Sequence, residues 1–324
     1  MPIRETRADG ARVVVTGSQG FVGRHVRAAL VRRGAVCVGV DRPGTGAEIE
    51  LDLADPAFDP AHVWSKAGSA TAVIYMAANI TRTSSVDVAA RSNLRLIAEA
   101  QVRLIESGVE RGLCSHVVDC STFKIFGPQQ QEQIVAKTHP RRPDPFSYGS
   151  AKALGERLLS IASSRAGFTY SMVHPTCIYG PGQHLHNAIP LFLKSALAGV
   201  DPVVFGDGKS VRDDVYAPDL ADVLIEAALQ KKVGSFHAHG EKPRTILEVA
   251  ELCCDAVAKM GGRSGLHPRL EAGKPPKWWL DQTFDHAATR DAFRFTPTPQ
   301  LDALMAEAEW IRAGAPRETE RFVR

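Results

Sequence analysis

Two side chains that could transfer a proton lie one helical turn apart near the middle of the chain. Tyr148 and Lys152 are four positions apart, which places them on one face of a helix, although an exposed surface pair is the alternative. Tyrosine in water has a pKa of about 10, too high for a base at neutral pH, but a neighbouring ammonium lowers that pKa. The pair could therefore exchange a proton with a substrate oxygen, and a hydroxyl at Ser121 or Thr122 could bind that oxygen.

A glycine-rich turn near the N-terminus has the sequence expected of a dinucleotide site. Gly17, Gly20 and Gly23 follow a short β-branched run and open a segment with helical spacing. Glycines allow a tight turn and a close approach of the pyrophosphate, which the free N–H groups of a helix N-terminus bind. The first gap is one residue longer than in the common Rossmann fingerprint. The alternative is a structural glycine turn.

Acidic residues after the turn bear on the choice of cofactor. Asp41 ends the second predicted strand, where a carboxylate can accept hydrogen bonds from the adenosine ribose. It favours NAD because it repels a 2′-phosphate, but Arg42 could pair with that phosphate, so NADP stays open. Asp52 and Leu53 are expected beside the adenine; a helix-capping role is the alternative for Asp52.

The elements that must position these groups alternate as in an α/β protein with a Rossmann-type, doubly wound parallel sheet. The predicted strands are 12–16, 36–40, 72–76, 116–120 and 169–173, and the predicted helices are 20–33, 86–107 and 148–166. Beyond Pro175 we predict a smaller, mixed α/β C-terminal lobe that binds substrate. Beyond Pro175 helices are expected at 189–198, 219–230, 246–260 and 301–313, and strands at 202–205 and 235–238.

These elements predict a division of the chain into three parts. A disordered leader is expected over 1–10. The NAD(P)-binding domain takes 11–175 and 213–239, and the substrate-binding lobe takes 176–212 and 240–324. His237 and His239 alternate on a predicted strand and are expected at its surface.

Composition narrows the possible partners. The net charge is +3 with scattered basic residues, so no nucleic-acid surface is expected. No apolar run reaches the roughly 18 residues of a membrane span. The six cysteines lack the paired spacing of a zinc site, which predicts reduced thiols, no bound metal and a cytoplasmic location.

Several further motifs accompany the glycine turn and the Tyr148–Lys152 pair. They are TGSQGFVG at 16–23, VIYMAA at 73–78, STFKIFG at 121–127, YGSAK at 148–152, HPTCIYGPG at 174–182 and VRDDVYAPDLAD at 211–222. In these motifs and their order the chain resembles the extended short-chain dehydrogenases/reductases of the NAD-dependent epimerase/dehydratase family.

That resemblance implies roles for individual residues. Thr122 would be the catalytic hydroxyl, Tyr148 the acid/base and Lys152 its partner and a ribose ligand, while Asn93 would support the active-site water network. The further residues that would contact the cofactor are Gly17, Gln19, Gly20, Phe21, Val22, Gly23, Asp41, Arg42, Asp52, Leu53, Met76, Ala77, Ala78, Asn93, Cys120, Pro175, Cys177 and Ile178.

The residues after the catalytic hydroxyl limit the reaction. Family members that dehydrate nucleotide sugars have an Asp-Glu pair there, whereas this chain has Phe123 and Lys124, so 4,6-dehydration is not expected. We predict an NAD-dependent nucleotide-sugar epimerase that acts through a transient keto-sugar. The alternative is an NAD(P)-dependent dehydrogenase or ketoreductase of a sugar, keto-sugar nucleotide or sugar acid. A non-catalytic dinucleotide sensor is a third reading, against which the presence of Thr122, Tyr148 and Lys152 argues.

Substrate and partner contacts follow from the same resemblance. Arg212 matches an arginine that contacts the nucleotide diphosphate, although an ion pair with Asp213 or Asp214 is the alternative. Asn187 is expected near the phosphates, with Phe123 and Lys124 beside the sugar. The late arginine of the epimerases is not evident, and His174 replaces an arginine common in the family. A homodimer through helices 86–107 and 148–166 is expected; the spacing of Leu154, Leu158 and Leu159 fits it, or fits the chain's own core.

Overall fold

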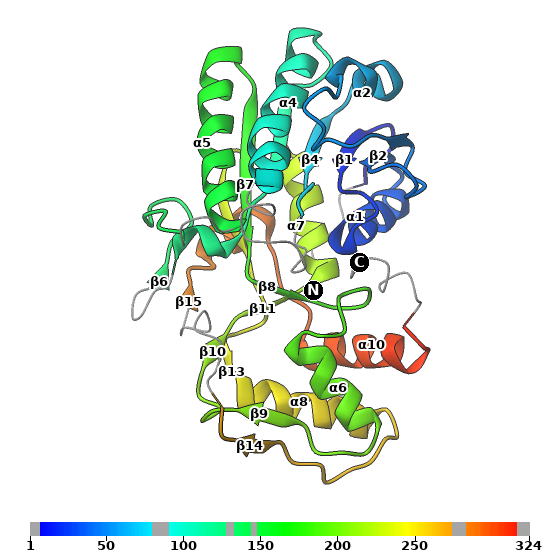
Figure 1. Cartoon of the computed structure of the whole chain (residues 1–324), viewed down its shortest axis with the longest axis vertical. Helices are drawn as coiled ribbons and strands as arrows, with labels where there is room; N and C mark the ends of the chain where they lie inside the picture. The colour runs from blue at the N-terminus through cyan, green and yellow to red at the C-terminus, as the bar shows by residue number, and fades with distance from the viewer. Residues whose placement is uncertain (1–6, 80–90, 128–132, 144–147, 274–282, 316–324) are drawn as a thin grey trace.

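A central parallel sheet organises the larger part of the molecule (Figure 1). The computed structural model describes residues 7–79, 91–127, 133–143, 148–273 and 283–315. Seven strands pair in the order β12-β7-β5-β4-β1-β2-β3, and every pairing is parallel. They are β1 (Arg12–Thr16), β2 (Val36–Asp41), β3 (Ile49–Glu50), β4 (Ala72–Tyr75), β5 (His116–Cys120), β7 (Thr169–Pro175) and β12 (Gly234–Ala238). The predicted Rossmann-type fold is confirmed.

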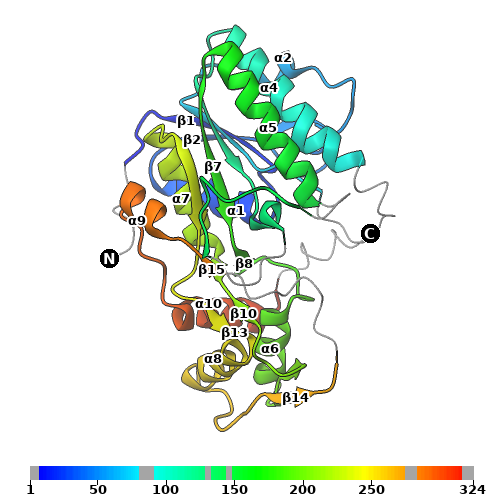
Figure 2. The same cartoon turned by 90° about the vertical axis from the view of Figure 1, so that its left-hand side faces the viewer.

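Helices cover both faces of this sheet, so its strands are largely apolar on both faces. Figure 2 shows α4 and α5 on one side of the sheet and α7 on the other. On one face Val13 and Val15 pack with Leu30 and Leu224, and on the other face Val14 packs with Trp64. The helices are α1 (Phe21–Arg32) and α7 (Ala217–Leu229) on the first face, and α2 (Pro60–Ala67), α4 (Ala100–Glu110) and α5 (Tyr148–Ala166) on the second.

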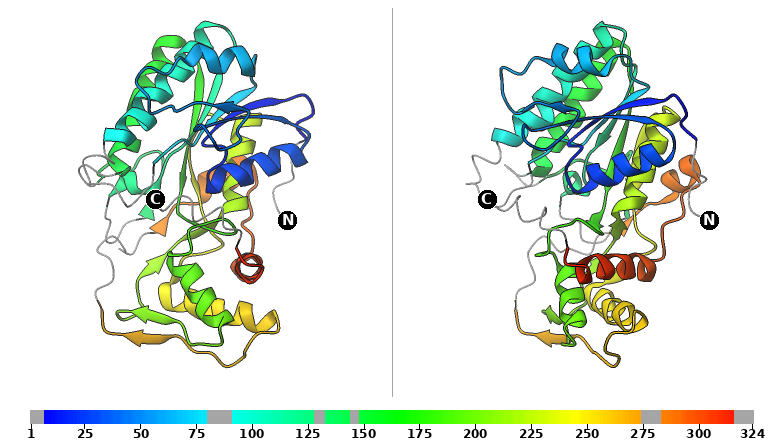
Figure 3. Two further views of the ribbon diagram at one scale, coloured as in Figure 1. Left: turned by 45° about the vertical axis from the view of Figure 1, so that its right-hand side comes forward. Right: turned by 90° about the vertical axis from the view of Figure 1, so that its right-hand side faces the viewer.

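A smaller lobe lies beyond the carboxyl ends of the strands (Figure 3). Its core joins α6 (Ala188–Leu197), α8 (Ile246–Lys259) and α10 (Gln300–Arg312). Thr245 and Glu248 cap each other's backbone at the start of α8, which fixes where that helix begins. Short strands pair near these helices: β8 (Cys177–Tyr179) with β11 (Asp214–Tyr216), β9 (Val203–Phe205) with β14 (Arg269–Glu271), and β10 (Val211–Arg212) with β13 (Arg244–Thr245). A further pair, β6 (Gln133–Ile134) with β15 (Thr283–Phe284), lies beside the start of α5.

The structure departs from the sequence-based prediction in several elements. The helix predicted over 86–107 falls partly on 80–90, outside the described residues; from there the chain is helical at 91–93, then forms a π-helical turn η1 (Leu94–Glu99) before α4. Two short helices were not predicted, α2 and α9 (Ala287–Phe293). The leader is shorter than predicted, because Ala8 is buried and its N–H binds the Arg33 carbonyl; residues 1–6 lie outside the described residues.

The expectation of surface histidines on β12 is wrong. His237 and His239 are buried, although β12 is the last strand of the sheet. The Phe284 ring lies 4.9 Å from the His237 ring, and the His286 ring stacks on His239 at 3.5 Å. The chain after β15 therefore covers this edge, which the alternation of residues within one strand could not reveal.

The division into a cofactor domain and a substrate lobe stays a prediction. Phe293 and Phe295, within the range assigned to the lobe, are buried in the same cluster as Val13 and Leu224 of the sheet layer. Within the part of the chain that the structure describes, no helix has both the length and the apolar character to cross a membrane.

Candidate active site

The glycine turn joins β1 to α1 and leaves no room for side chains. Gly17 has a φ of 68°, a left-handed conformation that glycine adopts without strain. A Cβ on Gly23 would lie 2.1 Å from the Gly17 carbonyl oxygen. Gly20 is the N-cap of α1 and offers no side-chain cap, so the first N–H groups of that helix have no cap of this kind. This close backbone turn fits the pyrophosphate of a dinucleotide.

Asp41 is held against this turn. Its Oδ2 accepts the Gln19 N–H at 2.8 Å and its Oδ1 accepts the Arg42 N–H at 2.8 Å. Each carboxylate oxygen can accept a further hydrogen bond, so the side chain is suited to a ribose. Arg42 is exposed beside it.

The prediction for Asp52 and Leu53 gains no direct support. Asp52 Oδ1 accepts the Ala54 N–H at 2.9 Å, a local turn rather than the helix cap considered as the alternative. Leu53 is buried in the core beside Val40 and Ile49.

A threonine hydroxyl brings the end of β4 to the turn. Thr16 Oγ1 accepts the N–H groups of Met76 at 3.0 Å and Ala77 at 3.1 Å. The Gly17 Cβ position is only 3.2 Å from the Ala77 backbone. The predicted contact residues Met76 and Ala77 therefore border the glycine turn, and Ala78 follows them in the chain.

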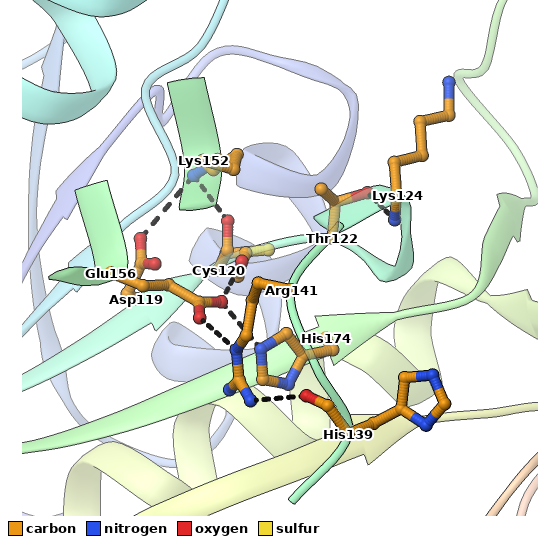
Figure 4. Close-up of polar contacts among 10 residues, drawn as sticks. Asp119, Cys120, Thr122, Lys124, His139, Arg141, Lys152, Glu156 and His174 are labelled. Atoms are coloured by element: carbon orange, nitrogen blue, oxygen red, sulfur yellow. Dashed lines mark hydrogen bonds and ion pairs between the residues drawn. The ribbon is translucent and has the colours of Figure 1, made fainter. Parts of the chain in front are cut away.

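Lys152 and Tyr148 lie at the start of α5, as the sequence predicts. Lys152 is fully buried, and its Nζ donates to the Cys120 carbonyl at 2.6 Å (Figure 4). Nζ is also 3.5 Å from Asp119 Oδ1. Burial lowers the pKa of Lys152, but Asp119 and Tyr148 outweigh it and raise that pKa above its usual value. The lysine is therefore cationic at neutral pH.

The phenol is less acidic than the sequence suggests. Burial raises the pKa of Tyr148 to about 12, while the Lys152 ammonium opposes that rise. The sequence correctly predicted that Lys152 lowers the pKa of Tyr148. It could not predict how strongly burial raises that pKa, because burial depends on tertiary packing.

The loop with Thr122 packs against the start of α5. Thr122 caps the short helix η2 (Phe123–Phe126), and its Oγ1 accepts the Lys124 N–H at 3.3 Å. A Cβ on Gly149 would lie 2.8 Å from the Lys124 carbonyl oxygen. The backbone next to Tyr148 therefore contacts the backbone two residues after Thr122. Lys124 itself is exposed, and Figure 4 shows its side chain extending away from Glu156 and His174.

A buried polar network beneath this site was not predicted. Glu156, one turn after Lys152, accepts Ser121 Oγ at 2.5 Å and lies 2.7 Å from His174 Nε2 (Figure 4). Arg141 Nε donates to its other oxygen at 3.3 Å. Burial raises the pKa of Glu156, but His174, Ser121 and Arg141 hold it at about 2. The signal available in the sequence was the continued four-residue spacing from Tyr148 through Lys152 to Glu156.

Asn93 and Asn187 have structural partners. Asn93 is buried immediately before the π-helical turn, and its Oδ1 accepts the Asn79 N–H at 3.0 Å. Asn187 is the N-cap of α6, and its Nδ2 donates to Gln183 Oε1 at 3.2 Å. Their predicted roles toward water and phosphate stay predictions.

For Arg212 the structure has the intramolecular ion pair that was the alternative. Its Nε is 3.1 Å from both oxygens of Asp214, and a second guanidinium nitrogen donates to Oδ1. Both side chains are buried rather than at the surface. Pro175 ends β7, while Cys177 and Ile178 begin β8, which pairs with the strand of Asp214.

The protein combines a Rossmann sheet, a glycine turn at the end of one strand and a tyrosine–lysine pair near the end of another. These features together define a class of dinucleotide-dependent proteins. The model of the NAD-dependent epimerase/dehydratase family matches residues 13–238, and the chain belongs to that family. A dTDP-4-dehydro-6-deoxy-D-allose reductase from a Streptomyces species is 25% identical over 94% of this chain and 97% of its own length.

Two solved structures are similar over almost the whole chain. A UDP-N-acetylglucosamine 4-epimerase from Methanobrevibacter ruminantium, in complex with UDP-N-acetylmuramic acid, has a TM-score of 0.79 and 22% identity, covering 94% of this chain and 99% of its own. MoeE5 in complex with UDP-glucose and NAD has a TM-score of 0.76 and 24% identity, covering 94% of this chain and 99% of its own.

Proposed function

We propose that this protein is an NAD-dependent nucleotide-sugar epimerase. The observation that carries the proposal is the packing of the loop that holds Thr122 against the start of α5, the helix of the Tyr148–Lys152 pair. Membership of the family and the similarity to an epimerase and to an NAD complex support it.

The described residues fit NAD. The turn from Gly17 to Gly23 would receive the pyrophosphate and Asp41 the adenosine ribose. Lys152 would bind the other ribose. When bound, NAD supplies a reversible acceptor for a hydride. Arg42 leaves NADP as the alternative cofactor.

The side chains would perform the proton transfer. Tyr148 would take the proton of a sugar hydroxyl and later return it to the oxygen of the keto-sugar. Lys152 would lower the free energy of the phenolate through its positive charge. Thr122 already accepts a hydrogen bond from Lys124 N–H, so its own proton is suited to donation toward the sugar oxygen.

A one-way dehydrogenase or ketoreductase is the second candidate. The Arg212–Asp214 ion pair concerns the substrate rather than the direction of the reaction. It engages the guanidinium expected to bind a nucleotide diphosphate, which favours a sugar or sugar acid without a nucleotide. The Streptomyces relative is itself a reductase. The substrate of such a dehydrogenase or ketoreductase could be a sugar, a keto-sugar nucleotide or a sugar acid.

The test supplies NAD and, in turn, UDP-glucose, UDP-N-acetylglucosamine, UDP-glucuronic acid and dTDP-glucose. An epimerase converts one of them to its epimer without net NADH absorbance, whereas a dehydrogenase accumulates NADH. Tyr148→Phe should lower turnover by about 10³-fold, since general acid–base groups contribute roughly 10² to 10⁴-fold, and should retain NAD binding. Undiminished turnover by this variant would reject the assignment.

A homodimer through α4 and α5, and a cytoplasmic location, also stay proposals. Leu159 faces the chain's own core, whereas Leu154 on the same helix is 43% exposed. Leu154 is thus the residue of the three that would face a second copy. Sedimentation of the purified protein distinguishes a monomer from a dimer.

A further inference from the structure

An aspartate interrupts the apolar face that β5 presents to α4 and α5. Asp119 shares this face with Val117, which packs against Ile105 and Leu159. The side chain is 0% exposed. Its register places it between Tyr75 of β4 and Met172 of β7, in the middle of the sheet. A carboxylate in such a place must have a partner of opposite charge or give up its charge.

Lys152 is the partner that the structure offers. Its Nζ lies 3.5 Å from Asp119 Oδ1, and both side chains are buried. Neither Asp119 oxygen has a partner in full hydrogen-bond geometry among the described residues, although Gln101 of α4 lies close enough to favour the ionised form. Burial raises the pKa of Asp119, and the Lys152 ammonium is the strongest influence against that rise.

The other groups around Asp119 are either neutral or occupied. Gln101 faces it from α4, and the hydroxyl of Tyr75 donates to the Leu96 carbonyl at 2.5 Å. Glu156 from α5 and His174 from β7 bind each other. Cys120 follows Asp119 in its own strand, and burial raises the pKa of that thiol to about 12, so it is neutral. Lys152 is the cation nearest to the carboxylate among the residues described.

The pair acts on Tyr148 in opposite directions. The Lys152 charge favours the phenolate, whereas the Asp119 charge disfavours it. In a buried site neither effect is screened by water as it would be at the surface. An ammonium with a carboxylate beside it acts less strongly on the phenol than an ammonium alone.

We propose that Asp119 is a positioning residue, the fixed counter-ion of Lys152, and that its charge moves the pH range in which Tyr148 exchanges its proton to higher values. It holds Lys152 against the Cys120 carbonyl and keeps the lysine charged inside the protein. The same negative charge makes the Tyr148 phenol less acidic. The inference rests on the proposed function only in naming Tyr148 as the group that exchanges the proton.

The test is a titration of the Tyr148 phenolate in Asp119→Asn, a variant of nearly the same shape without the charge. Phenolate absorbance is recorded immediately after a pH jump, and the signal of the same protein carrying Tyr148→Phe is subtracted, which removes the other four of the five tyrosines. We expect the Tyr148 midpoint to fall by about one pH unit in Asp119→Asn. A midpoint that stays the same or rises would overturn the proposal.

Glu226→Gln is the matched control. Glu226 is also a fully buried carboxylate in an ion pair, with Arg33 Nη1 at 2.8 Å, but it lies on α7 away from the site. Its loss should lower stability without moving the Tyr148 midpoint. An equal shift in both variants would mean that general destabilisation moves the midpoint, and would also overturn the proposal.

A second measurement covers the case in which Asp119→Asn does not fold. In the background of Lys152→Met the ammonium is gone, and Asp119 would be a buried charge without a partner. Adding Asp119→Asn there should raise the melting temperature, whereas in the wild type it should lower it. A decrease in both backgrounds would contradict the ion pair. Neither readout needs turnover, so failure of the epimerase assignment is distinguishable from failure of this inference.

Discussion

The glycine turn and the smaller lobe of this molecule are built from different kinds of contact. At the glycine turn the geometry comes from backbone groups, such as those of Gly17 and Gly23, and from Asp41 at the end of the neighbouring strand β2. In the smaller lobe, polar and charged side chains are engaged with one another, as in Arg212 with Asp214 and Gln183 with Glu307.

This difference indicates where in the chain amino-acid substitutions are tolerated. A backbone cradle binds any dinucleotide of the right shape and leaves little choice of residue. Buried charge pairs can be exchanged for others without altering the sheet beneath them. We therefore expect changes at the glycine turn to abolish function broadly, and changes in the lobe to alter substrate affinity or stability by smaller amounts.

The largest expected effect is at the turn itself. Gly23→Val should weaken NAD binding by about 100-fold or more, because a Cβ there would lie 2.1 Å from the Gly17 carbonyl oxygen and the turn must open. Isothermal titration with NAD measures the loss. Gly112→Asn is the control, since Gly112 has a φ of 66° with nothing within 4 Å of its Cβ position, and asparagine tolerates that conformation. Full NAD affinity in Gly23→Val would contradict a pyrophosphate site built from the backbone of the glycine turn.

An intermediate effect is expected at Arg212. Asp214→Asn removes the charge that engages the guanidinium, and binding of UDP should tighten by about tenfold if Arg212 reaches the diphosphate. The melting temperature should fall, because a buried arginine loses its counter-ion. Binding of UDP by calorimetry is the measurement. An unchanged affinity would show that Arg212 serves the lobe's stability and not the substrate, which favours the reductase or dehydrogenase acting without a nucleotide.

The smallest effect concerns stability and pH. Burial raises the pKa of Glu307 on α10 to about 8, against which the Gln183 hydrogen bond works. The folded protein therefore retains a proton that the unfolded chain releases near pH 4.5. This contribution to stability is complete below pH 4.5 and is lost as the pH rises through about 8.

Glu307→Gln removes that dependence. Between pH 5 and pH 8 the melting temperature of the wild type should fall by about 5 °C more than that of the variant. Differential scanning calorimetry at the two pH values measures the difference. Parallel slopes in the two proteins would mean that Glu307 is ionised throughout.

The parts of the fold that the sequence predicts are those governed by local pattern. Val13 to Val15 and Ala72 to Tyr75 are continuous apolar runs, which indicate strands covered on both faces. Helix α5 begins at Tyr148 and ends at Ala166, as its spacing predicts. The helix predicted over 86–107 could not show its π-helical turn, since the apolar spacing of a sequence does not reveal a change of hydrogen-bond register.

The sequence predicted that Tyr148 and Lys152 share one helix, but not the charged groups that surround them. Tyr148 and Lys152 are four residues apart, and their helix is fixed locally. Asp119 and Lys152 come from a strand and a helix 33 positions apart, and Glu156 meets His174 across two elements. Nothing in the sequence states which strand lies beneath which helix, so these pairs could not be assigned.

By itself the sequence determined the periodic elements, the glycine turn and the helical spacing of the two proton-transfer side chains, because each depends on backbone preferences within a few residues. Only the tertiary structure decided which charges are buried together, Asp119 beside Lys152 and Asp214 beside Arg212, and which rings stack, His286 on His239. The reason is that a charge inside a protein is tolerated only with its partner in place, and the partner is chosen by strand order and packing rather than by neighbourhood in the chain.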